Sequence, residues 1–243
     1  YTTLFRSLEG DTVVAEYSLA SGNIFTVRYT LLEGGILSVE SDFKGVKSSK
    51  PVDVPRIGFR MRLPASADSF TYLGRGPEEN YADRFGGTLI GEYSSSASKE
   101  YVRYVRPQEC GHHIDCEYLS IGGLAIRSDR FEFNALRCAV EDLDSEEAVQ
   151  RDYQWENKGP LTENDPAKAK NRLRRQTHIN DYVERDFVEV CVDYAQSGVG
   201  GYDSWAARPD GDRCLWSDRD YSFRFAIVPA RAMGVRKSLG FDF

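Results

Sequence analysis

Several residue types are scarce in this sequence. The 243 residues include only two Met, three His and three Trp, and no apolar run approaches the roughly 20 residues that a membrane-spanning helix needs. Positive charge is also in the minority, with 31 Lys and Arg against 38 Asp and Glu, whereas nucleic-acid binding depends on clustered basic residues. We therefore expect a soluble protein that has neither a membrane nor a nucleic acid as its partner.

Cysteine is sparse and irregularly spaced. Cys110 and Cys116 flank His112 and His113 in a segment that at first suggests a metal site. Consecutive residues of a strand point to opposite faces, however, so both rings cannot easily reach one ion, and we expect no metal. The total of five cysteines is odd, none forms a C-x-x-C pair, and a core of this size needs no covalent staples. We therefore expect no disulfide framework.

The bulk composition is that of an ordinary globular protein. Hydrophobic residues make up 41% and charged residues 28%, which excludes bulk disorder. The chain begins at Tyr1 without an initiator Met or a signal-like apolar segment, so we interpret it as a piece excised from a longer protein. Its compartment stays open between cytoplasm and periplasm.

The dominant periodicity is that of β-strands. Apolar and polar residues alternate in Arg56–Leu63, Val188–Tyr194 and Phe223–Ile227, and Phe25–Phe43 is interrupted by the turn residues Glu33–Gly35, which predicts a hairpin. Such strands direct their apolar side to the core and their polar side to water or another layer. The predicted core side chains are Ile57, Phe59, Met61, Val188, Val190, Phe223 and Phe225.

Helix signals are few. Asp144–Glu147 and Asn164–Arg174 are candidates for short helices, and Asp152–Glu163, which has no clear period, is interpreted as an exposed loop. The sequence therefore predicts one antiparallel all-β domain with few short helices.

Several ordered motifs resemble a known family. In chain order they are PRIGFRMRLP (Pro55–Pro64), LGRGPEENYADR (Leu73–Arg84), YVRPQECG (Tyr104–Gly111), HINDYVERDFVEVCVD (His178–Asp193) and VGGYDSW (Val199–Trp205). Together they resemble the C-terminal domain of the lacZ-type β-galactosidases of glycoside hydrolase family 2, from about Phe25 to Pro229. The resemblance implies a large antiparallel β-sandwich of the galactose-mutarotase type.

The chain also departs from that family. Cys110, Tyr202 and Ala206 stand where the family usually has Asn, Asp, and Gly or Ser. Arg151–Lys170 resembles a loop insertion, and the W-R-A-P-T-D-N-D motif of the family's first strands is missing. Residues 1–243 are therefore interpreted as a single domain that lacks its first strands.

The resemblance implies an enzyme whose chemistry lies elsewhere. Retaining glycosidases need two carboxyl groups about 5–5.5 Å apart, and the family's catalytic Glu pair belongs to a separate barrel domain of the same chain. We therefore interpret Glu78, Glu79, Asn80 and Asp83 as a local network, assign no catalytic residue to this chain, and expect the fragment alone to be inactive. The family acts on terminal β-galactosides such as lactose, forms homo-oligomers, and binds its Mg²⁺ and Na⁺ mainly in other domains, so no cofactor is expected here.

Trp205 is the one residue that the resemblance places against substrate. On residue type alone a lone Trp is more often part of a core. In the family, the Trp at this position reaches into the barrel's active site and stacks on the sugar. Gly200 and Gly201 predict a turn, and Asp203 and Ser204 can bond nearby backbone amides and support the loop.

Two alternatives remain open. One is a free-standing carbohydrate-binding or assembly module. The other is a mutarotase-like aldose epimerase, which needs a carboxylate and a His as base and acid. The mutarotase motifs do not occur around His112, His113 or His178, so the β-galactosidase domain is favoured.

Overall fold

The computed structural model describes residues 2–19, 21–105, 108–143, 182–201 and 207–230. The strands are β1 (Thr2–Glu9), β2 (Thr12–Ser18), β3 (Ile24–Leu32), β4 (Ile36–Lys44), β5 (Asp53–Val54), β6 (Arg56–Pro64), β7 (Ser69–Gly76), β8 (Leu89–Ser96), β9 (His112–Ile121), β10 (Leu124–Leu136), β11 (Phe187–Gln196), β12 (Leu215–Trp216) and β13 (Tyr221–Pro229). Short 3-10 turns are η1 (Glu33–Gly35), η2 (Val140–Leu143) and η4 (Gly211–Arg213). The described residues contain no α-helix. Both helix candidates lie outside them.

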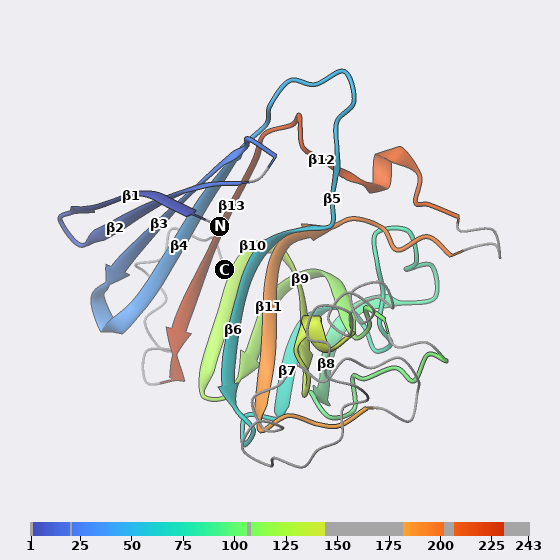
Figure 1. The fold of residues 1–243 in the computed structure, drawn as a ribbon. Coiled ribbons are helices and arrows are strands. Elements are labelled where there is room, and N and C mark those ends of the chain that lie inside the picture. The colour runs from blue at the N-terminus through green and yellow to red at the C-terminus, as the bar shows by residue number, and fades with distance from the viewer. Residues whose placement is uncertain (1, 20, 106–107, 144–181, 202–206, 231–243) are drawn as a thin grey trace, which may run out of the picture.

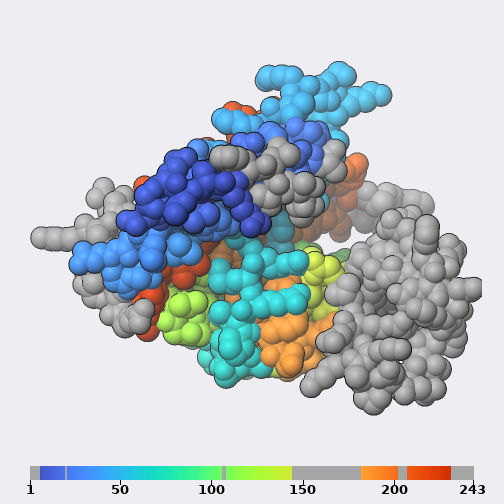
Figure 2. Space-filling model, turned by 60° about the vertical axis from the view of Figure 1, so that its left-hand side comes forward, coloured from blue at the N-terminus to red at the C-terminus, as the bar shows by residue number. Residues whose placement is uncertain are grey.

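In an 11-stranded antiparallel sheet, the long strand β10 pairs with β9, which continues through β7 to β8, and two further arms start from β10. Its first part, Leu124–Arg127, pairs with β13, which continues through β4, β3 and β2 to β1. Its last part, Glu132–Leu136, pairs with β11, which in turn pairs with β6. Figure 1 shows the first arm extending to one side of β10 and the second arm on the other. In Figure 2 the cyan β6 and the orange β11 lie side by side on the surface.

Aromatic rings close the space between the two arms. The ring of Phe59 on β6 lies 5.2 Å from that of Phe225 on β13 and 6.0 Å from that of Phe25 on β3, centroid to centroid. Phe133 of β10 meets Phe70 of β7 edge to face at 5.7 Å. Burying a side chain of this size stabilises the fold by about 1.5–3 kcal/mol. The predicted large antiparallel all-β fold is therefore confirmed, with its core between facing layers.

The predicted strands and core are confirmed. Each alternating segment forms a strand, and Phe25–Phe43 forms the β3–β4 hairpin across η1. Val188 and Val190 are completely buried, while Phe59 and Met61 are half-buried and pack against the same cluster. The other predicted core residues, Ile57, Phe223 and Phe225, are buried as well.

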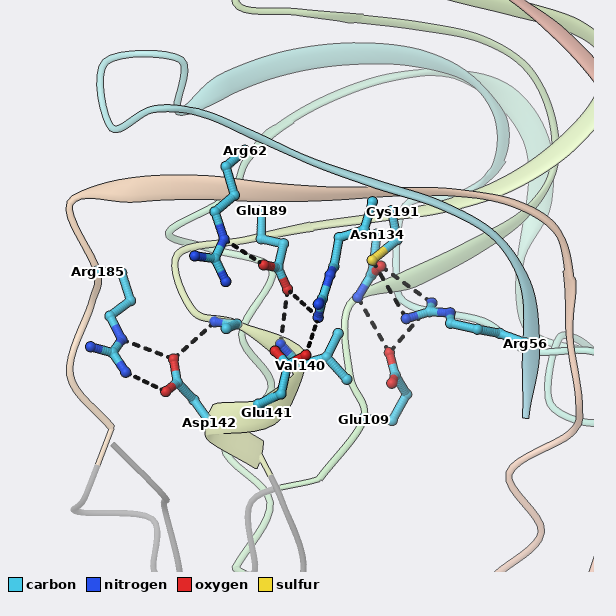
Figure 3. A network of polar contacts seen from close by, with 12 residues as sticks. Arg56, Arg62, Glu109, Asn134, Val140, Glu141, Asp142, Arg185, Glu189 and Cys191 are labelled. Atoms are coloured by element: carbon cyan, nitrogen blue, oxygen red, sulfur yellow. Dashed lines mark hydrogen bonds and ion pairs between the residues drawn. The ribbon is translucent and has the colours of Figure 1, made fainter. Parts of the chain in front are cut away.

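The polar side of β11 is buried rather than exposed to water. Glu189 is 2% exposed and Asp193 is 1% exposed, and Cys191 between them is also buried. Figure 3 shows Arg62 of β6 reaching Glu189, at 2.9 Å from guanidinium nitrogen to carboxylate oxygen. Because a buried charge without a partner is costly, the acidic side chains of β11 can be buried only with such ion pairs.

Tyr194, expected on the core side with Val188, Val190 and Val192, lies at the edge of the core, where its ring is 6.3 Å from that of Phe223 and 5.6 Å from that of Tyr221, centroid to centroid. Tyr194 is 37% exposed. The β11–β6 register shifts between Asp193 and Ala195, and such a bulge changes which face the following side chains take. No helix in the described part of the chain is long and apolar enough to cross a membrane.

Candidate functional site

Three of the sequence motifs meet at one end of the sheet, and Glu79 connects the first two. Its carboxylate accepts hydrogen bonds from the Gly111 backbone amide at 2.7 Å and from the Tyr104 hydroxyl, and it pairs with the Arg84 guanidinium at 2.6 Å. Glu79 and Arg84 belong to LGRGPEENYADR, whereas Tyr104 and Gly111 are the two ends of YVRPQECG. A carboxylate that is bonded to this many donors has a structural role.

Asn80 holds the turn that follows β7. Its side-chain amide donates to the carbonyls of Arg75 and Glu78, both at 2.9 Å, and its oxygen accepts from the Ile114 amide at 2.9 Å. The predicted local network is therefore present around Asn80 and Glu79. Arg75 instead pairs outside the motif, with Asp115 at 2.9 Å.

Asp83 connects the first motif to the third. Its carboxylate oxygens accept hydrogen bonds from the backbone amides of Val199 at 3.1 Å and Gly200 at 2.8 Å. The chain passes so closely that a Cβ on Gly198 would lie 2.6 Å from the Asp83 carboxyl carbon. A charged acceptor shared by two successive amides fixes the direction of the loop that starts here.

The loop is attached at its entry to the two-stranded β5–β12 sheet, and farther on it closes on itself. On the way in, Ser197 Oγ donates to Asp53 at 2.7 Å and accepts from the Leu215 amide at 2.8 Å. Farther on, the Gly201 amide donates to the Ala207 carbonyl at 3.3 Å. These bonds bring the entry and the exit of the loop together.

Gly200 and Gly201 both adopt left-handed backbone conformations, with φ of 65° and 85°, which a residue with a side chain takes only at a cost. A Cβ on Gly200 would also collide with the Ala207 carbonyl oxygen, whereas the space around Gly201 is open. Asp203, Ser204 and Trp205 lie outside the described residues, so their predicted contacts stay predictions. Trp155 lies outside them as well, while Trp216 donates through its indole nitrogen to the Gly211 carbonyl at 2.8 Å.

The two neighbouring histidines belong to separate networks. His112 Nε2 lies 3.0 Å from Glu132, and His113 Nε2 lies 2.9 Å from Glu100. Burial lowers the pKa of His112 to about 3 and raises the pKa of Glu132 to about 7. Within the described ranges, no three His, Cys, Asp or Glu side chains gather in a way that could hold a metal ion. All five cysteines are free thiols, and Cys214 alone among them is not fully buried.

A buried network that sequence reasoning missed joins the second motif to β11. Arg56 pairs with Asp193 at 2.9 Å and donates to Gln196 Oε1 at 3.1 Å. It also lies 3.8 Å from Glu109 of the YVRPQECG motif (Figure 3). Burial raises the pKa of Asp193 to about 7 against the opposing pull of Arg56. The signal in the sequence was the matched alternation of Arg on β6 with acids on β11, which predicts facing charges once the two strands are known to pair.

Comparison with known proteins gives the family. The family model described as "Beta galactosidase small chain" matches residues 3–227. The β-galactosidase of Priestia megaterium is 29% identical over 228 residues, which covers 90% of this chain and 19% of the relative. Those of Actinobacillus pleuropneumoniae and Pseudoalteromonas haloplanktis are 26% and 30% identical, over 92% and 82% of this chain and 19% and 16% of their own lengths. The chain thus spans about a fifth of the relatives it matches, and it belongs to the β-galactosidase small chain family.

Proposed function

We propose that this chain is the small-chain domain of a galactoside hydrolase of the lacZ type, in which it forms one wall of the sugar site. Its membership of the β-galactosidase small chain family supports this proposal, as do the names of the relatives. A separate barrel domain supplies the catalytic carboxylates. This chain supplies the loop that carries Trp205 and the support that holds the loop in place.

The observation that carries the proposal is the attachment of that loop. Asp83 holds the amides of Val199 and Gly200, and the Gly201 amide closes on the Ala207 carbonyl. Trp205 is one of the five residues between Gly201 and Ala207, whose backbones form the anchored base of the loop. An aromatic ring on a constrained loop suits a sugar, whose C–H face packs on the ring while its hydroxyls stay hydrated.

The carboxylates of the motifs favour a supporting role over a catalytic one. Glu79 is bonded to Arg84, Tyr104 and the Gly111 amide, and Asp83 is bonded to the loop backbone. A glycosidase pair needs two carboxyl groups that face the scissile bond about 5 Å apart, one of them free to act as nucleophile. Glu79 and Asp83 are already engaged within the fold.

The test is Trp205→Ala in the full-length enzyme that contains this chain. We expect substrate binding to weaken by about 1–3 kcal/mol, the range for losing a buried aromatic contact, while the fold is unchanged. Trp205→Tyr keeps a ring and should retain much of the affinity. Trp216→Phe is the matched control, because Trp216 is bonded to Gly211 rather than carried on the loop. Unchanged kinetics of Trp205→Ala on lactose and aryl galactosides would refute the proposed role.

A further inference from the structure

A cavity of about 230 Å³ opens beside the first motif, between the β7–β8 hairpin and the segment after β8. Its wall includes Tyr72, Pro77, Tyr93, Ser95, Lys99 and Glu100. None of the roles assigned above uses this cavity.

Glu100 is the group that makes the cavity a candidate site. It is only 9% exposed, and one of its oxygens, Oε2, is bonded to His113 Nε2 at 2.9 Å. Because a carboxylate only accepts, this nitrogen of His113 carries the proton. No described residue bonds to the other oxygen, Oε1, and Glu100 lines the cavity. This oxygen is open to the cavity rather than enclosed by protein, so a ligand bound there can donate a hydrogen bond to it.

The carboxylate is also held in one orientation. His113 is completely buried, and its Nδ1 lies 3.1 Å from the Tyr72 hydroxyl and 3.2 Å from the Arg75 carbonyl. Burial raises the pKa of Tyr72 above its ordinary range, so the phenol keeps its proton. Because both nitrogens of the His113 ring have partners, the Glu100 carboxylate bonded to it has little freedom. A carboxylate that is already ordered loses little conformational entropy when a ligand binds.

The charges around the cavity select the class of ligand. Glu78 and Glu100 are negative and Lys99 is positive, while Glu79 is already bonded to Arg84 and Tyr104. An anion would face the carboxylates, and an organic cation would face the ammonium. The hydroxyl groups of a neutral ligand can donate to the carboxylates and accept from the ammonium.

The aromatic part of the cavity wall favours the same class of ligand. Tyr72 and Tyr93 lie 5.5 Å apart, centroid to centroid, with their ring planes tilted by 37°. Tyr72 is 1% exposed and packs against Tyr93, so the half-buried Tyr93 ring is the aromatic surface that the cavity offers. Ring faces pack well on aliphatic C–H groups, and the Ser95 hydroxyl lies near them to meet polar ones. From the cavity, its prearranged carboxylate and the Tyr93 ring, we propose that this chain binds a neutral polyol of monosaccharide size here. This site goes beyond the proposed role of Trp205 and does not depend on it.

The test is saturation-transfer NMR on the 243-residue chain, which the family resemblance places apart from the barrel's catalytic site. The probes are galactose, glucose and myo-inositol, each at about 10 mM, enough to fill a site with a Kd of order 1 mM. Tris and inorganic phosphate report on cationic and anionic ligands. We expect transfer to the C–H protons of at least one polyol and to neither charged probe.

Two variants locate the site. Glu100→Gln removes the carboxylate and should weaken the polyol's binding by about tenfold, and Tyr93→Leu removes a ring from a partly exposed strand. Glu117→Gln, an exposed carboxylate on β9, is the matched control and should bind as the parent does. If Glu100→Gln does not fold, Tyr93→Leu decides alone. Absence of transfer to every polyol, transfer only to Tris or phosphate, or polyol binding that Tyr93→Leu leaves unchanged would each overturn the proposal.

Discussion

The carboxylate of Asp83 accepts a hydrogen bond of 2.8 Å from the backbone amide of Gly200, a residue 117 positions later in the chain. The neighbouring amide of Val199 donates to the same side chain at 3.1 Å. One carboxylate therefore sets the starting direction of a loop that belongs to a distant motif. The sugar-binding role proposed for that loop depends on this bond, and the predictions begin with it.

Replacing Asp83 by Asn should impair the loop more than the fold. The amide keeps one acceptor but turns a donor toward an N–H group, so one of the two loop bonds is lost. In the full-length enzyme we expect KM for an aryl galactoside to rise about five- to tenfold, which corresponds to losing one hydrogen bond worth about 1 kcal/mol. The urea midpoint should change little, because Asp83 is only partly buried.

Asp129→Asn, which alters an exposed carboxylate, is the control for that change and should leave both quantities as they are. A KM for Asp83→Asn equal to that of the parent would show that the loop does not depend on this side chain.

The two loop glycines should respond differently to alanine. Gly200 and Gly201 both have positive φ, so each substitution costs about 1–2 kcal/mol of backbone strain. Gly200→Ala adds a collision with the Ala207 carbonyl, whereas Gly201→Ala meets open space. Gly200→Ala should therefore lower the melting temperature and the kcat/KM of the full-length enzyme more than Gly201→Ala does. Equal effects of the two substitutions would contradict this reading of the turn.

The 243-residue chain alone should not hydrolyse a chromogenic galactoside. The reason is that Glu79 and Asp83 are bonded within the fold, and the proposed function has the catalytic pair in another domain. The measurement is release of nitrophenol across a size-exclusion profile, with full-length enzyme as the positive control. Activity that follows the peak of the isolated chain would contradict the proposal that another domain supplies the catalytic carboxylates.

Glu132 should make stability depend on pH. Burial raises its pKa from an ordinary 4.5 to about 7, so the folded chain binds this proton more tightly than the unfolded chain does. Its contribution to the free energy of unfolding is therefore complete below about pH 4.5 and is lost as the pH rises toward about 7. A shift of this size corresponds to as much as about 3 kcal/mol.

Glu132→Gln removes the pH-dependent contribution of Glu132, because a Gln side chain does not titrate. His112 has a lowered pKa, and its own contribution changes in the opposite sense, increasing as the pH rises from about 3 toward its ordinary 6.5. Because His112 lies 3.0 Å from Glu132, replacing Glu132 also alters the His112 contribution, so the difference between the two proteins reports on this buried pair. Urea unfolding at pH 5 and pH 8 should show the parent losing more stability than Glu132→Gln. Parallel pH profiles would mean that Glu132 is ionised throughout.

Local pattern was enough to predict much of the fold. A period of two places alternate side chains on opposite faces whatever the rest of the chain does. Val188 and Val190 are therefore found in the core, as predicted, and the Glu33–Gly35 turn joins β3 to β4. The ordered motifs in the same way pointed to the family to which the chain belongs.

Long-range pairing decided the rest. Arg56 and Asp193 are 137 positions apart, and their buried ion pair exists only because β6 lies beside β11. The shift in that pairing between Asp193 and Ala195 falls at Tyr194, which lies at the edge of the core and is 37% exposed, and no count of alternating residues reveals it. The Asp83–Gly200 bond has the same origin. Periodicity is a property of neighbouring residues, whereas strand register, bulges and contacts between loops depend on which distant segments the fold brings together.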